Sequence, residues 1–256
     1  MADNKTAIKA IRDSGSITDA EVLARIFSDP TLSDDGTTFG RLRAILDATE
    51  HTMIPGLQTG IAFHDSGFAV EFKDPWPSSD NQVGHFLTAV GLSFDPSKLR
   101  RSVIGKSMRD WLNAPPSYSD EEVAVRLCVG HEKSPDPSAG TAAAGGIVGG
   151  ITGGLAGAAA GAAMAILDTF RQQFAAATTA DIAVFRSAVA KLGTGSPLNK
   201  VSASAEMHGI TVIPTGRGNS YQDLLLTIYG WRLGQTIKID NPPKSDITSW
   251  VRTNLM

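Results

Sequence analysis

Histidines are the side chains of this sequence best suited to acid–base or metal chemistry. The five histidines are His51, His64, His85, His131 and His208. No two of them have the spacing of an HExxH motif, in which one helix presents two imidazoles to the same ion. From spacing alone, the sequence therefore predicts no bound metal ion and no cofactor.

His85 has the most informative surroundings of the five. Its segment is predicted to be a helix whose apolar side chains are Val83, Phe86, Leu87 and Val90. Asn81 and Thr88 lie four and three residues from His85, so these polar side chains share the opposite helix face. The simpler interpretation of this face is that it is exposed to solvent.

An extended segment before this helix supplies further titratable groups. The stretch FHDSGFAVEFKD contains His64 and Glu71. If it folds back on the helix, His64 and Glu71 meet His85 and form either a general acid and base or a site of two histidines and one carboxylate for a metal ion. Under this hypothesis the protein is a soluble hydrolase with His85, His64 and Glu71 as its catalytic residues.

A run of small residues at 142–166 is the most regular feature of the chain. The run, AAAGGIVGGITGGLAGAAAGAAMAI, has glycines every four residues, at Gly145, Gly149, Gly153, Gly157 and Gly161. Residues four apart lie above one another on a helix, so a helix here has a groove almost free of side chains. The pattern resembles the glycine zipper of membrane-spanning and pore-forming segments, where small residues let helices approach closely.

Three interpretations of this run remain open. Residues 137–167 carry no charge, and about 20 apolar residues suffice to span a bilayer. In water, its eight glycines reduce the stability of a helix by roughly 8 kcal/mol relative to eight alanines. If the run is helical, lipid or close packing must therefore offset that loss. The run is therefore a membrane-active helix, a core helix of a soluble bundle, or a flexible linker.

We expect the first interpretation, a membrane-interacting helical protein of the effector or pore-forming type. Its partners would be membrane lipid, or a second copy of the chain bound through the glycine groove. A non-catalytic structural or interaction module is a further alternative. The start of the chain lacks the apolar core of a signal peptide, so we expect synthesis in the cytoplasm, with membrane association to follow.

Composition and charge exclude some classes of protein. Hydrophobic residues make up 42% and charged residues 19% of 256 residues, which is close to globular averages. The net charge is −3, and the basic residues form no run, so we expect no nucleic-acid binding. The single cysteine, Cys128, allows no intrachain disulfide, and its aliphatic neighbours indicate an inert core residue.

Capping and periodicity predict a mainly α fold, a multi-helix bundle with a long Gly/Ala-rich central helix or helical hairpin and minor short strands. Capping boxes begin helices at Thr18, Ser79 and Ser119, and Asp95 caps another. A break is expected near Ala177. Strands or extended pieces are expected at 68–72, 210–213 and 236–239.

Three regions follow from these elements. Residues 1–137 form an acidic helical domain with one short strand, and residues 138–167 form the glycine-patterned helix. Residues 168–256 form a C-terminal helical region with a small extended element.

Overall fold

The computed structural model describes most of the chain, namely residues 3–15, 17–49, 66–73, 82–100, 102–103, 106–134, 158–193, 198–213 and 220–256. Within these ranges the protein is a mainly α multi-helix bundle, as predicted. The only strands described are β1 (Ser102–Val103) and β2 (Lys106–Ser107), which pair antiparallel.

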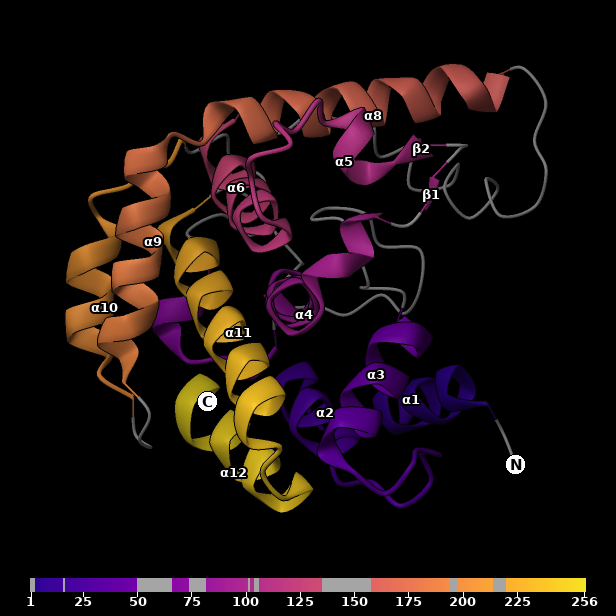
Figure 1. Cartoon of the computed structure of the whole chain (residues 1–256). Coiled ribbons are helices and arrows are strands. Elements are labelled where there is room, and N and C mark those ends of the chain that lie inside the picture. Colours follow the sequence, from indigo (N-terminus) through magenta and orange to yellow (C-terminus); the bar gives the residue numbers. More distant parts are fainter. Residues whose placement is uncertain are drawn as a thin grey trace.

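The N-terminal helices form one side of the bundle (Figure 1). They are α1 (Asn4–Asp13), α2 (Asp19–Ile26) and α3 (Thr38–Thr49). The Thr18 side chain accepts a hydrogen bond from the backbone N–H of Glu21 and begins α2, as its capping sequence predicts. The C-terminal helix α12 (Lys244–Leu255) packs against α2, so the two ends of the chain share this side.

Helix α4 (Gln82–Phe94) lies at the centre of the bundle, and every one of its residues is buried (Figure 1). Its main neighbour is α11 (Tyr221–Asp240). Gly230 and Gly234 let the two backbones approach closely, because a Cβ at these positions would lie 2.5 Å from the Phe86 carbonyl oxygen and 2.4 Å from that of Val90. Glycines four residues apart therefore pack α11 on α4.

The remaining long helices are α6 (Asp120–Lys133), α8 (Ala158–Ala176), α9 (Thr179–Leu192) and α10 (Lys200–Met207). Of these, α6 packs against α4, α8 packs along α6, and α9 packs against α6, α10 and α11. Ser119 caps α6 as predicted, and the break between α8 and α9 falls at the expected position, with Thr178 as the cap of α9. Helix α8 lies along α6 and continues past α5 (Met108–Trp111) (Figure 1).

The strand predicted at 68–72 is wrong. The structure has a turn of 3-10 helix there, η1 (Val70–Phe72). Alternation would place Phe68, Val70 and Phe72 on one face, but Phe68 and Phe72 are buried while Val70 is 81% exposed. The turn breaks the alternation after Phe68, so that Phe72 stays buried while Val70 faces solvent.

Three further expectations are also corrected. Residues 236–239 are not extended; they complete α11, in which Ile237 is buried and the chain leaves the helix at Asn241 in a left-handed conformation. The helix expected from Asp95 is divided into η2 (Pro96–Arg100), β1, β2 and α5. Residues 210–213 form no strand, and the backbone N–H of Ile213 donates instead to the carbonyl of Glu132.

One hydrophobic core joins the first and last regions of the chain. The buried side chains form a single cluster that extends from Ala7 to Leu255. Helix α4 from residues 1–137 and helix α11 from residues 168–256 lie at its centre. Backbone contacts also cross between these regions, for example the hydrogen bond of 2.8 Å from the N–H of Ala69 to the carbonyl of Leu255.

Most of the predicted glycine groove lies outside the described residues. This applies to Gly145, Gly149, Gly153 and Gly157, whereas Gly161 lies in α8. Of the helices in the described ranges, none is both long enough and apolar enough to cross a lipid bilayer.

Candidate metal centre

Two helices bring two histidines and one glutamate together inside the bundle. His85 lies in the first turn of α4, and His131 and Glu132 lie in the last turn of α6. His85 and His131 are each 8% exposed and Glu132 is fully buried. The interpretation of the His85 face as solvent-exposed is therefore wrong, because α4 is covered on all sides by its neighbours.

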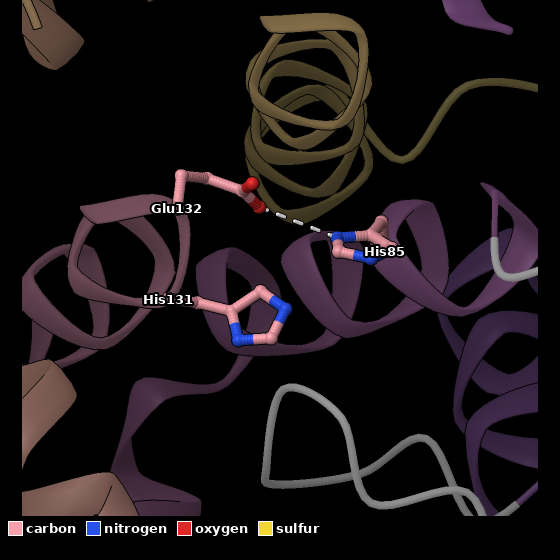
Figure 2. A group of neighbouring side chains, drawn as sticks. All are labelled: His85, His131 and Glu132. Carbon is pink, nitrogen blue, oxygen red and sulfur yellow. Dashed lines mark ion pairs between the residues drawn. The ribbon is translucent and has the colours of Figure 1, made fainter. Parts of the chain in front are cut away.

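The three side chains converge on one small volume (Figure 2). His85 Nδ1 lies 3.4 Å from Glu132 Oε1. The two imidazole rings are 5.1 Å apart between centroids and are tilted by 43°. One potential ligand atom from each of the three residues lies within 4.8 Å of the others.

A second layer of buried polar groups holds these side chains in place. Gln173 of α8 lies 3.0 Å from His131, measured from its Nε2 to Nδ1 of the ring. The backbone N–H of Ser220, the cap of α11, donates to Glu132 Oε2 over 3.3 Å. Four helices, α4, α6, α8 and α11, therefore contribute to the site.

Asp223 extends this layer toward the start of α4. The Ser220 hydroxyl donates to Asp223 Oδ2 over 3.0 Å, and the backbone N–H of Asp223 donates to that hydroxyl oxygen over the same distance. The side-chain amide of Gln82, one turn before His85, donates to Asp223 Oδ1 over 3.1 Å. A continuous buried network thus runs from α4 through α11 to Glu132.

Burial also sets the protonation of His131. Its removal from water, together with the neighbouring His85, lowers its pKa from 6.5 to about 3, although the bond to Gln173 acts in the opposite direction. His131 is therefore a neutral imidazole near pH 7, the form that binds metal ions. One turn earlier, burial raises the pKa of the Cys128 thiol, with a further contribution from Glu132, so this cysteine is an inert thiol.

The geometry fits a four-coordinate zinc ion. Zinc binds nitrogen and oxygen at about 2.0–2.2 Å, so neighbouring ligand atoms lie about 3.4 Å apart. The His85–Glu132 separation of 3.4 Å has this value. The remaining separations do not exceed 4.8 Å, so the three groups are close enough to share one ion after a small adjustment of their side chains.

The sequence-based site is only partly described. His64 lies outside the described residues. Glu71, on η1, forms an ion pair of 2.7 Å with Lys200 of α10, and the carboxylate next to His85 is that of Glu132. The missed pattern is the pair His131–Glu132 directly after the apolar run LCVG, where two polar residues continue a buried helix.

Comparisons with protein-family models, with curated proteins and with solved structures found no match. The chemistry of the site therefore has to be inferred from its own residues. Two imidazoles and a carboxylate are ligands that suit zinc and other transition metals of similar softness.

Proposed function

We propose that this chain binds one divalent metal ion of the zinc class through His85, His131 and Glu132. The convergence of three potential ligand atoms within 4.8 Å in a buried site is the observation that carries the proposal. Removing a carboxylate from water costs several kcal/mol unless it is paired or bound to a cation. Together with the N–H of Ser220 and the neighbouring His85, a metal ion at this position would offset that cost for Glu132.

The ligand set also supports hydrolytic chemistry. Catalytic zinc sites have three protein ligands and keep the fourth position for water, whereas structural sites are closed by four. A bound ion of this kind lowers the pKa of its water ligand to about 7 and so provides a nucleophile. Hydrolysis is therefore the reaction class that we assign to the site, with His85, His131 and Glu132 as ligands.

Metal binding is tested on the full chain after treatment with a chelator. Wild-type protein should bind one equivalent of Zn²⁺ in a calorimetric titration, and Co²⁺ should give the visible spectrum of a four-coordinate site. His131→Asn and Glu132→Gln should weaken binding by more than about 100-fold, since even outer contacts of metal ligands contribute 10- to 100-fold.

His208→Asn provides the matched control for these variants. His208 is exposed and its ring packs against Tyr221, with a centroid distance of 4.5 Å, so its replacement should leave the affinity unchanged. The proposal is wrong if wild-type protein shows no saturable Zn²⁺ binding, or if Glu132→Gln binds as tightly as wild type.

The open coordination position has its own test. Azide added to the Co²⁺ protein should shift the visible bands, because it replaces the water ligand. An unchanged spectrum at high azide concentration would show a closed site and would overturn the hydrolytic assignment without affecting the metal assignment.

We also propose association with membranes through residues 137–167. The support is the absence of charge over this run together with its four-residue glycine period; its last part, from Ala158, is helical in α8. Full-length protein should float with liposomes of neutral and anionic lipid. Gly149→Asp with Gly153→Asp should reduce flotation, because charged side chains are costly to bury in lipid, whereas the control Thr152→Leu should not; recovery of all wild-type protein in the soluble fraction would contradict this proposal.

A further inference from the structure

We propose that Gln173 is the positioning residue that selects the metal-binding tautomer of His131. In the metal-bound protein the carbonyl of Gln173 accepts a hydrogen bond from Nδ1–H of His131, which leaves the Nε2 lone pair for the ion. This inference rests on the metal-binding function proposed above.

The contact between the two side chains is buried and direct. Gln173 is 2% exposed, and its amide lies 3.0 Å from Nδ1 of His131. Because Nδ1 is engaged by Gln173, Nε2 is the ring nitrogen that remains for a ligand role. Figure 2 shows a ring nitrogen of His131 pointing toward the side on which His85 lies.

Gln173 fits both tautomers of the ring. With its NH₂ group toward His131, as in the structure, it donates to Nδ1 and the ring carries its proton on Nε2. In the described part of the chain, no donor reaches the buried carbonyl oxygen of Gln173. Rotation of the amide by half a turn places this oxygen against Nδ1 and allows it to accept from Nδ1–H.

The change of tautomer leaves the number of protons on the His131 ring unchanged. The ring releases the proton of Nε2 and takes up one proton on Nδ1, so it is neutral before and after the change. Metal-bound histidines generally donate their second ring N–H to a carbonyl or carboxylate, which fixes the ring orientation. Gln173 supplies that acceptor for His131.

The backbone next to His131 is shaped to bring Gln173 this close. A Cβ at Gly130 would lie 1.8 Å from the carbonyl oxygen of Gln173, so any larger residue would push α8 away from α6. Gly130 thereby fixes the distance at which the Gln173 amide meets the ring. This close approach and the amide contact are independent observations that lead to the same role.

The experiment combines variants with a direct measurement of the tautomer. Gln173→Glu keeps an accepting oxygen and removes the NH₂ group, so it should retain Zn²⁺ affinity. Gln173→Leu removes the acceptor and should lower the affinity by 10- to 100-fold. Gln172→Leu, at an exposed position beside it, is the matched control and should bind as wild type does.

Nitrogen-15 NMR of the histidine rings in the full wild-type chain measures the tautomer directly. With one equivalent of Zn²⁺, Nδ1 of His131 should carry the proton and Nε2 should bind the ion. Binding through Nδ1, or a Gln173→Leu variant with wild-type affinity, would overturn this role while the metal site stands. Absence of Zn²⁺ binding by wild-type protein would overturn both proposals, and the NMR result decides the matter even if Gln173→Glu does not fold.

Discussion

The backbone N–H of Ser220 donates a hydrogen bond of 3.3 Å to Oε2 of Glu132. This bond joins the start of α11 to the end of α6 and leaves Oε1 of the same carboxylate toward His85, 3.4 Å away. The orientation of a potential metal ligand is thus set by the cap of a helix that lies far away in the sequence.

Replacement of Asp223 should destabilise the fold around Ser220 and Glu132. Asp223→Ala removes the acceptor of both the Ser220 hydroxyl and the Gln82 amide. Hydrogen bonds to a buried carboxylate are worth about 1.5–3 kcal/mol each, so we expect a loss of about 3 kcal/mol in unfolding free energy, measured by urea denaturation. Asp240→Ala, at an exposed position of the same helix, should change the unfolding free energy little. An equal loss in both variants would show that the buried hydrogen bonds of Asp223 do not stabilise the fold.

Zinc should stabilise the wild-type fold. A ligand that binds only the folded state adds about 2.7 kcal/mol at 100 times its dissociation constant. For a chain of this size, that gain corresponds to an increase of about 5–10 °C in Tm. Differential scanning calorimetry should show this increase for wild type and not for Glu132→Gln, and the same increase in both proteins would place the ion elsewhere.

The ion pair between Asp34 and Arg41 should make stability depend on acid pH. Their side chains are 5% and 4% exposed, and Arg41 also donates to the backbone carbonyls of Ile26, Asp29 and Leu32. Burial acts to raise the pKa of Asp34, but hydrogen bonds from Lys244 and Arg41 outweigh it and lower this pKa from 3.8 to about 2.

Because the pKa of Asp34 is lower in the folded state, its stabilising contribution is present above pH 4 and is lost as the pH falls toward 2. The shift corresponds to about 2 kcal/mol at neutral pH. Asp34→Asn should therefore destabilise the protein at pH 7, by about 3 kcal/mol since Arg41 stays buried. The difference in unfolding free energy between this variant and wild type, measured by urea denaturation, should shrink between pH 4 and pH 2. A constant difference would contradict the lowered pKa of Asp34.

The close packing of α11 on α4 should not tolerate a methyl group. Gly234→Ala would gain about 1 kcal/mol in helix propensity, yet its Cβ would lie 2.4 Å from the Val90 carbonyl oxygen. We expect a net loss of about 1–3 kcal/mol, typical of overpacked sites, measured by thermal denaturation. Gln235→Ala at the next, half-buried position should be nearly neutral, and a stabilised Gly234→Ala would show that the helices can separate without loss.

Local hydrogen bonding made several elements predictable from sequence. Thr18 and Ser119 begin helices because their hydroxyls accept from backbone N–H groups three residues later. These bonds form within one turn and need no distant partner. The mainly helical class followed in the same way, from caps and from apolar residues at helical spacing.

Contacts between distant segments decided the rest. The aromatic residues Phe68 and Phe72 have a spacing that allows a strand or a helical turn, and only the core around them selects the turn. His85 and Glu132 lie on separate helices, so their proximity depends on how α4 and α6 pack. The sequence by itself determined the capped helices and the mainly helical class, since a helix bonds within itself. The tertiary structure alone decided which polar side chains meet, because burial among distant neighbours has no local pattern.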